Sequence, residues 1–343
     1  TGDDDAGDDD AGDDDAGDDD TGDDDDNGDD DTGDDDTGDD DDSPPAAGLT
    51  YAYFAIHLDP GASPALPNDG GPNPSRGLDY FDDLVDLVEA ADTGGHKLTL
   101  MFTAQWAAHV LSNDCALPGP PSASDYIYQG ASHASCLDLV RAFAAHGHEI
   151  AFHHHPEDAP NNWDGFTNTA PPHPQGYLGD VDDLMNWVEQ VPVGGIDTIT
   201  AGTTEEYPLI HSLRFMGARG PTPYVDATDR GDLASTPCAW SEDGNEVWRW
   251  RMRSYSNDHS LVRGELQAAA ADLATVPGPW TAGFITHAKD VDGDLVEYVL
   301  LFDALSQLNL VMEGLSTVAS HYDWTDADPV PGGTHACPVD EAL

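Results

Sequence analysis

The sequence predicts an α/β domain built on a parallel sheet, closed as a barrel or open and doubly wound, with an acidic repeat in front of it. Short apolar runs typical of buried strands alternate with longer segments whose apolar residues follow a helical period. Residues 43–343 are numerous enough for one large domain with a sizeable hydrophobic core. Residues 1–42 differ in composition from the rest of the chain, because they contain almost no apolar residue.

Residues 1–42 repeat the unit Thr/Ala-Gly-Asp-Asp-Asp and contain 26 Asp and no basic residue. Adjacent carboxylates repel each other and no apolar side chain is available to bury, so we expect residues 1–47 to form a disordered spacer. Carboxylate clusters also suit weak calcium binding, but the EF-hand pattern with its distant Glu is absent. The plain spacer is the favoured interpretation.

The charge excludes two classes of partner. The chain has 68 Asp and Glu against 11 Lys and Arg, for a net charge of -57, and residues 43–343 alone still carry -31. Such a surface repels nucleic acid and anionic membranes, whereas a neutral glycan is not repelled. We find no stretch of about 20 apolar residues that could span a bilayer.

The first half of the domain alternates strand and helix. Residues 51–58 form an apolar, aromatic run before the turn residues Asp59-Pro60-Gly61, which is typical of a buried strand. Apolar residues at helical spacing predict a helix over 80–91, and the run at 97–103 predicts the second strand. A helix over 136–145 and a strand over 148–153 follow.

The second half continues the alternation. The run at 246–255 alternates apolar and basic residues, which predicts a strand, and the run at 280–287 predicts another. Strands separated by helices imply parallel pairing, with the chemistry at the carboxyl ends of the strands. The other expected elements are helices over 180–191, 204–216, 261–273 and 295–308 and strands over 197–201 and 310–313.

Histidine and carboxylate side chains stand at three of these strand ends. His57 and Asp59 share one face of the first strand because side chains alternate, and His153 and His155 do the same in a third. His287 ends a late strand. Imidazoles with one carboxylate are a ligand set that zinc accepts in an open catalytic site. The alternatives are a solvated chelating loop for His153 and His155 and a structural role for His287.

The segment His146–His153 (HGHEIAFH) resembles the G-H-E-I-x-x-H stretch of polysaccharide deacetylases. The resemblance implies a distorted (β/α) barrel of about seven parallel strands over residues 48–325. It also implies one divalent metal ion, zinc being the expected choice, held by Asp59 and His153, with His155 as the second histidine. Members remove N-acetyl groups from amino-sugar polymers, which makes a glycan the substrate, and His287 matches the histidine that protonates the leaving amine.

The chain departs from the family at the expected general base. Leu58 stands directly before Asp59, where the family has a second Asp. His57, Asp59 or Glu157 can take this role, and Glu157 is also a further candidate ligand. The missing Asp supports an alternative function, a catalytically inactive module for carbohydrate binding or surface display.

Several tryptophans are candidates for contact with sugar rings. Trp106 follows the second strand, and Trp163 lies in the long segment after the third. Trp248 and Trp250 alternate with arginines in the strand over 246–255. For that strand we favour a Trp side packed into the core and an Arg side that pairs with surface acids.

The cysteines predict two disulfides and export from the cell, since no C-x-x-C pair suggests zinc. We expect Cys115 to pair with Cys136, which closes a local loop, and Cys238 with Cys337, which ties down residues 326–343. An extracellular or cell-surface protein, tethered through the acidic spacer, is the expected setting. The sequence contains no indication of the oligomeric state.

Overall fold

The computed structural model describes residues 47–58, 74–112, 128, 135–154, 181–201, 215–219, 233–242, 245–256 and 258–322. All of them fall within one compact unit, Pro44–Leu343. The acidic repeat lies outside the described residues, so its role as a spacer stays a prediction.

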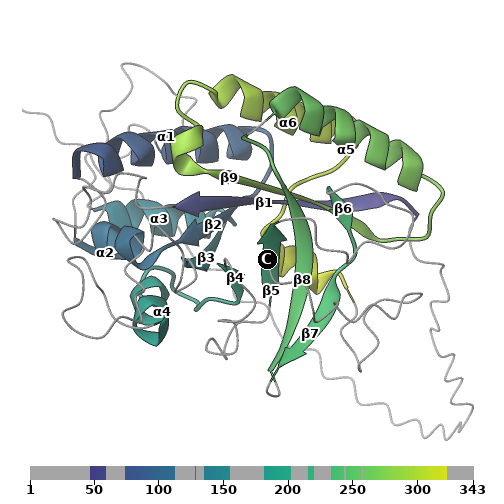
Figure 1. Cartoon of the computed structure of the whole chain (residues 1–343). Coiled ribbons are helices and arrows are strands. Elements are labelled where there is room, and N and C mark those ends of the chain that lie inside the picture. The colour runs from purple at the N-terminus through teal and green to yellow at the C-terminus, as the bar shows by residue number, and fades with distance from the viewer. Residues whose placement is uncertain are drawn as a thin grey trace, which may run out of the picture. The chain divides into compact units, whose positions relative to one another are not determined.

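Seven strands pair in parallel (Figure 1): β1 (Leu49–Leu58), β2 (Thr99–Phe102), β3 (Glu149–His154), β4 (Thr198–Ala201), β5 (Phe215–Arg219), β8 (Asn245–Ser254) and β9 (Trp280–His287). The parallel pairs run from β1 through β2, β3, β4 and β5 to β8. β9 pairs with both β8 and β1, which links the two ends of this series as a barrel-like sheet requires. The predicted α/β class with a parallel sheet is confirmed.

Two short strands extend the sheet in antiparallel fashion. β6 (Ala234–Ser235) pairs with β9, and β7 (Cys238–Glu242) pairs with β8. Both short strands lie beside β8 in Figure 1.

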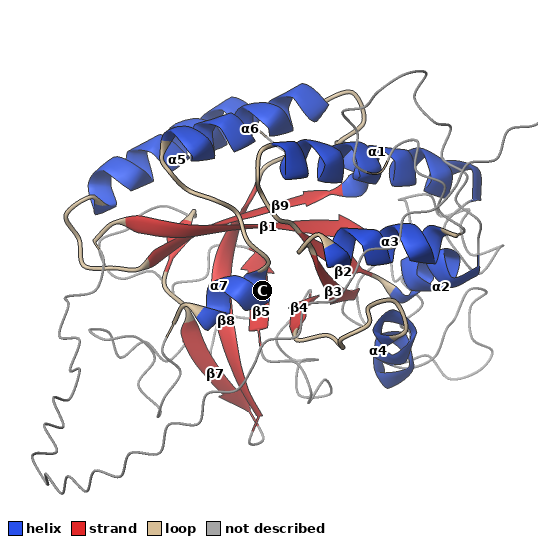
Figure 2. Cartoon of the chain, turned by 180° about the vertical axis from the view of Figure 1, so that it is seen from behind, coloured by secondary structure: helices blue, strands red, loops and turns tan. Residues whose placement is uncertain are grey.

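Helices cover the outer face of the parallel strands (Figure 2). α1 packs against α6 and α6 against α5, whereas α2 packs against α3 and α4. Among the described helices, none combines the length and the apolar composition needed to cross a membrane. The helices are α1 (Pro74–Thr93), α2 (Ala104–Ser112), α3 (Cys136–Ala145), α4 (Val181–Glu189), α5 (His259–Leu273), α6 (Leu295–Gln307) and α7 (Leu315–Ser320), with a 3-10 turn, η3 (Ala288–Asp290).

The strands separate two hydrophobic cores. Even-numbered residues of β1, such as Phe54, face the outer core beneath the helices, and odd-numbered residues, such as Tyr53, face the inner core. Because both faces of β1 are buried, its sequence is continuously apolar rather than alternating. Trp248 and Trp250 lie in the inner core, as expected for the Trp side of this strand, while Arg253 bonds Glu265 at 3.3 Å.

The helix expected over 204–216 is wrong at its end. Phe215 and Met216 belong to β5, which pairs with β4 on one side and β8 on the other. Those two ladders satisfy backbone groups that a helix would have satisfied internally, so tertiary pairing overrides the local helical period. Residues 204–214 lie outside the part of the chain that the structure describes.

The last strand expected over 310–313 is also wrong. Its single ladder contact is an isolated bridge between Ala52 and Met312. Lys97 N donates to Met312 O at 2.8 Å and Glu313 N to Ala52 O at 3.0 Å, so this segment bonds β1 at one residue and the residues before β2 instead of forming a continuous ladder. It leads into α7, which the sequence pattern did not predict.

α7 closes the amino-terminal end of the strands. Leu315 lies in the inner core, and its N–H donates to Thr99 Oγ1 at 2.9 Å. Ser316 N donates to the half-buried Glu149 carboxylate at 3.1 Å, and the hydroxyls of Thr99 and Thr198 donate to the same carboxylate. Burial raises the pKa of Glu149. The start of β2, β3 and β4 is thereby joined to α7 through one side chain.

A buried carboxylate holds the end of α1 against β2 and α3. Asp92 accepts from Tyr128 Oη at 2.5 Å and from Lys97 Nζ, and its Oδ2 lies 3.3 Å from His148 Nε2. Leu98 N donates to His148 Nδ1 at 3.0 Å, so Nε2 carries the ring proton and faces the carboxylate. Burial raises the pKa of Asp92, but hydrogen bonds from His148, Lys97 and Tyr128 outweigh it and hold this pKa well below its ordinary value.

Asp92→Asn is expected to lower the free energy of unfolding by about 2 kcal/mol at pH 7, because it weakens charge-assisted hydrogen bonds. The depressed pKa makes Asp92 stabilising above the unfolded-state pKa of about 3.9, and this contribution is lost as the pH falls through the folded-state pKa. Denaturant unfolding of both proteins between pH 7 and pH 3 should therefore show a difference that shrinks in acid. The exposed Asp303, changed to Asn, is the control and should alter stability by less than about 0.5 kcal/mol. Equal effects of the two substitutions contradict the role given to Asp92.

Candidate functional site

Three histidines meet at the carboxyl ends of the strands. The His57 ring stacks on the His153 ring with centroids 3.9 Å apart, and the His287 ring meets His57 edge-on at 5.4 Å. His57 and His153 are buried, at 7% and 3% exposure, whereas His287 is partly exposed. Three strands that are far apart in the sequence thus supply one imidazole cluster, called the histidine cluster below.

The alternation of strand side chains explains this convergence. His57 continues the odd-numbered, inward face of β1, and it pairs in register with His287 of β9. His153 follows Ala151 on the inner face of β3. Thr103 Oγ1 donates to Leu58 O at 2.9 Å, which fixes the end of β1 against the end of β2.

His287 is held by a carboxylate on the following turn. Its Nδ1 lies 3.0 Å from Asp290 Oδ2 across the 3-10 turn Ala288–Asp290. Burial raises the pKa of Asp290, but the hydrogen bond and the charge of His287 outweigh it, so this pKa lies below its ordinary value. The ionised carboxylate can only accept, so Nδ1 donates to it. Any catalytic role of the His287 ring therefore falls to Nε2.

Sequence reasoning named His287 but not the pairing with Asp290. The available signal was the spacing of three residues, which places the two side chains together once the chain turns after β9. That spacing is common in acidic sequences, so it is weak evidence without the turn.

Several predicted site residues lie outside the described part of the chain: Asp59, His155, Glu157 and Trp163. Within the described residues, no group of three or more His, Cys, Asp or Glu is arranged to hold a metal ion. The donors that are described fit such a site chemically, because imidazole suits zinc and related metals. In the sequence, Asp59 and His155 each follow the last described residue of a strand, Leu58 of β1 and His154 of β3.

Trp106 does not lie where a ligand contact requires it. It is 1% exposed in the outer core, and its ring stacks on Phe81 with centroids 6.0 Å apart. The apolar face of α2 therefore uses Trp106 for packing, which does not suit the predicted role in substrate binding.

Cys136 opens α3, is fully buried and is not a free thiol. The side chains of Cys115, Cys238 and Cys337 lie outside the described residues. The two expected pairings therefore stay predictions.

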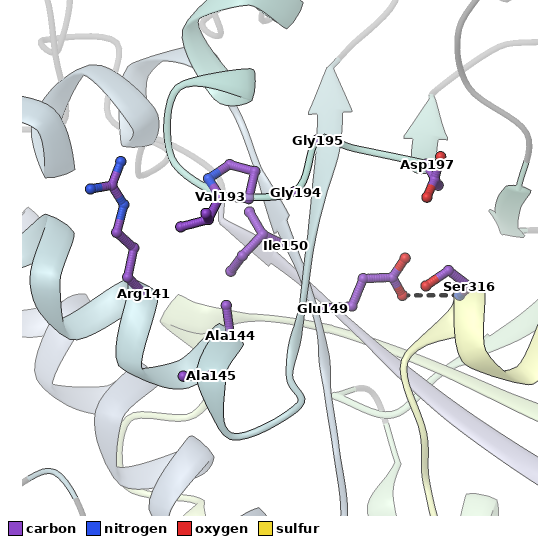
Figure 3. A pocket seen from close by; sticks show the side chains of 11 residues that line it. Arg141, Ala144, Ala145, Glu149, Ile150, Val193, Gly194, Gly195, Asp197 and Ser316 are labelled. Atoms are coloured by element: carbon purple, nitrogen blue, oxygen red, sulfur yellow. Dashed lines mark hydrogen bonds between the residues drawn. The ribbon is translucent and has the colours of Figure 1, made fainter.

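A separate pocket of about 380 Å³ lies at the opposite, amino-terminal end of the strands (Figure 3). Its lining includes Arg141 of α3, Glu149 at the start of β3 and Ser316 of α7. The Arg141 guanidinium donates to the carbonyls of Val191 and Gln190, and Glu149 is bonded to Ser316. These charged groups already serve the packing of α3, α4 and α7, so we assign the chemistry to the histidine cluster.

No protein-family model matches the sequence, and no curated protein matches it. Among solved structures, the chain is similar to a Mycobacterium smegmatis protein assigned as a polysaccharide deacetylase, with 13% identity and a TM-score of 0.49 over 81% of this chain and 93% of that one. It is also similar to a 4-alpha-glucanotransferase from Thermococcus litoralis, with 10% identity and a TM-score of 0.48 over 80% of this chain and 38% of that one. A polysaccharide deacetylase from Bacillus cereus shows 12% identity and a TM-score of 0.35 over 82% of this chain and 97% of that one. None of these three TM-scores reaches 0.5, so function must be inferred from the residues of the site.

Proposed function

We propose that the protein is a secreted, metal-dependent hydrolase that removes N-acetyl groups from an amino-sugar polymer. The observation that supports this proposal is the histidine cluster, in which His57, His153 and His287 converge while Asp290 holds His287. The deacetylase-like segment His146–His153 leads directly into this cluster.

The proposed metal ligands are Asp59, His153 and His155. These two imidazoles and one carboxylate are a ligand set that zinc accepts in a catalytic site. A bound divalent ion, most suitably zinc, would supply Lewis-acid polarisation of the acetyl carbonyl. His153 is buried against His57, so its ring is held in place before a ligand binds.

His287 is the proposed general acid. Asp290 holds Nδ1 and orients the ring, so Nε2 is the nitrogen through which the protonated ring would deliver a proton to the leaving amine. For the general base we favour His57, because its ring is in contact with both His153 and His287. Asp59 and Glu157 are the alternatives for this role.

The charge of the chain supports a neutral substrate. The net charge of -57 disfavours polyanionic glycans, whereas a neutral acetylated amino-sugar polymer such as chitin carries no charge to repel. The paired-cysteine prediction supports an extracellular or cell-surface location. In that setting residues 1–47 act as a hydrated spacer, and a disulfide ties down residues 326–343.

Acetate release from N-acetylated chitin oligomers and from peptidoglycan tests the proposal. Purified full-length protein should release acetate, lose this activity on dialysis against a chelator and regain it when zinc is restored. Binding of the oligomers without acetate release, in protein that contains one equivalent of metal, would overturn the hydrolase and leave a carbohydrate-binding module.

A further inference from the structure

One buried phenol bonds both residues that flank the His287 turn. Tyr298 Oη lies 2.8 Å from Thr286 Oγ1 and donates to the Asp290 carbonyl oxygen at 3.3 Å. Since the single phenolic proton goes to that carbonyl, Thr286 donates to Tyr298. Thr286 precedes His287 on β9, and the side chain of Asp290 holds His287 Nδ1.

The position of Tyr298 is itself fixed by packing. The side chain is fully buried, and its ring stacks on Phe54 with centroids 6.0 Å apart and meets Tyr255 at 5.3 Å. Tyr255 Oη donates to Glu297 O at 2.7 Å, one residue before Tyr298, which anchors the first turn of α6. Burial raises the pKa of Tyr298, so it remains a neutral donor. A rigid element therefore carries the hydroxyl that contacts the turn.

The turn is also held by the backbone bond from Val291 N to Ala288 O at 3.2 Å and by a side-chain hydrogen bond between Asp290 and Ser256, but neither bond involves the Asp290 carbonyl oxygen. η3 contains three residues, and no side chain caps its start at His287. Rotation of the Asp290 peptide would move the Asp290 carboxylate and, with it, the His287 ring. A hydrogen bond to the Asp290 carbonyl opposes that rotation, and the bond to Thr286 ties the same hydroxyl to the strand on the other side of His287.

We propose that Tyr298 is a positioning residue that sets the direction of the His287 imidazole by clamping Thr286 and Asp290. This inference rests on the proposed function for its catalytic consequence, because His287 is the proposed general acid. Tyr298 itself touches neither substrate nor metal. Its effect is to keep His287 Nε2 directed at the position of the leaving amine.

Tyr298→Phe removes the hydroxyl and retains the packing of the ring. We expect kcat for acetate release to fall about tenfold while KM changes by less than about twofold and metal content is unchanged. Thr286→Val removes the other end of the clamp and should give the same pattern. Tyr322→Phe is the matched control, because it removes the hydroxyl of another buried tyrosine that bonds a threonine of β9, Thr281, at the end of the strand opposite to His287.

A second readout does not depend on activity. The ¹⁵N chemical shifts of His287 report which ring nitrogen carries the proton. In wild type and Tyr322→Phe the neutral ring should be a single tautomer protonated at Nδ1, and in Tyr298→Phe and Thr286→Val it should be a mixture of tautomers. If wild type releases no acetate, the proposed function fails, and the shifts alone still decide the clamp. Unchanged shifts in both clamp variants, or a kcat as high as that of the control, overturn the role of Tyr298.

Discussion

His153→Ala is expected to release the bound metal ion and to lower kcat/KM for deacetylation by about 1,000-fold or more. The substitution removes one of three proposed ligands and the ring on which His57 stacks at 3.9 Å. Two remaining ligands hold a divalent ion far more weakly than three. Elemental analysis of protein purified without chelators, together with acetate release, measures both effects.

His321→Ala is the control for this experiment. His321 is an exposed histidine after α7, where it bonds Glu313 at 2.6 Å, and it lies at the end of the strands opposite to the histidine cluster. Its loss should leave one equivalent of metal and full activity. Equal metal content in wild type and His153→Ala would show that the ion is bound elsewhere and would remove His153 from the site.

Gly283→Ala is expected to destabilise the fold by about 3 kcal/mol or more. An added Cβ would meet the Arg251 carbonyl oxygen at 2.1 Å and the Tyr53 ring at 2.8 Å. Tyr53 Oη donates to that same carbonyl at 3.1 Å, so the hydrogen bond occupies the space beside Gly283. The Arg251 carbonyl belongs to the backbone of β8, which cannot move aside as a flexible side chain can. The contact lies where β9 approaches β8. Chemical denaturation measures the loss.

Gly264→Ala is the matched change on α5, at an exposed helical position where an added Cβ meets nothing within 4 Å. It should stabilise the protein by about 0.5–1 kcal/mol, because alanine has the higher helix propensity. If both substitutions destabilise to the same extent, the close approach at Gly283 is not the cause.

The sequence predicts best the elements whose own residues contain a clear local pattern, such as a helix cap or a continuous apolar run. α3 and β9 have the predicted boundaries, because a capping serine precedes α3 and β9 is one continuous apolar run. β5 was missed because its five residues include a glycine and its stability comes from two partner strands. α7 was missed because its packing depends on Glu149 and Thr99, more than 160 residues earlier.

The site residues also divide into those that the sequence predicts and those that it does not. Their positions at the ends of three parallel strands placed His57, His153 and His287 at one edge of the sheet, and the structure brings these rings together. The contributions of Asp290 and Tyr298 were not predictable, because they depend on the turn after β9 and on the docking of α6. From the sequence, Tyr298 is simply one more apolar position of a helix, and Trp106 was misassigned because a buried and a ligand-facing tryptophan look alike.

The parallel pairing of β1 with β9 has a consequence for how the chain acquires its structure. β1 spans Leu49–Leu58, and its partner on one side is not complete until His287, so β1 leaves the ribosome more than 200 residues before this partner is available. Its other neighbour, β2, forms much earlier, and a partial sheet with an open edge precedes the finished domain. Contacts of such long sequence separation slow folding, so newly made chains pass through a period in which the apolar edge of β1 is exposed to other chains.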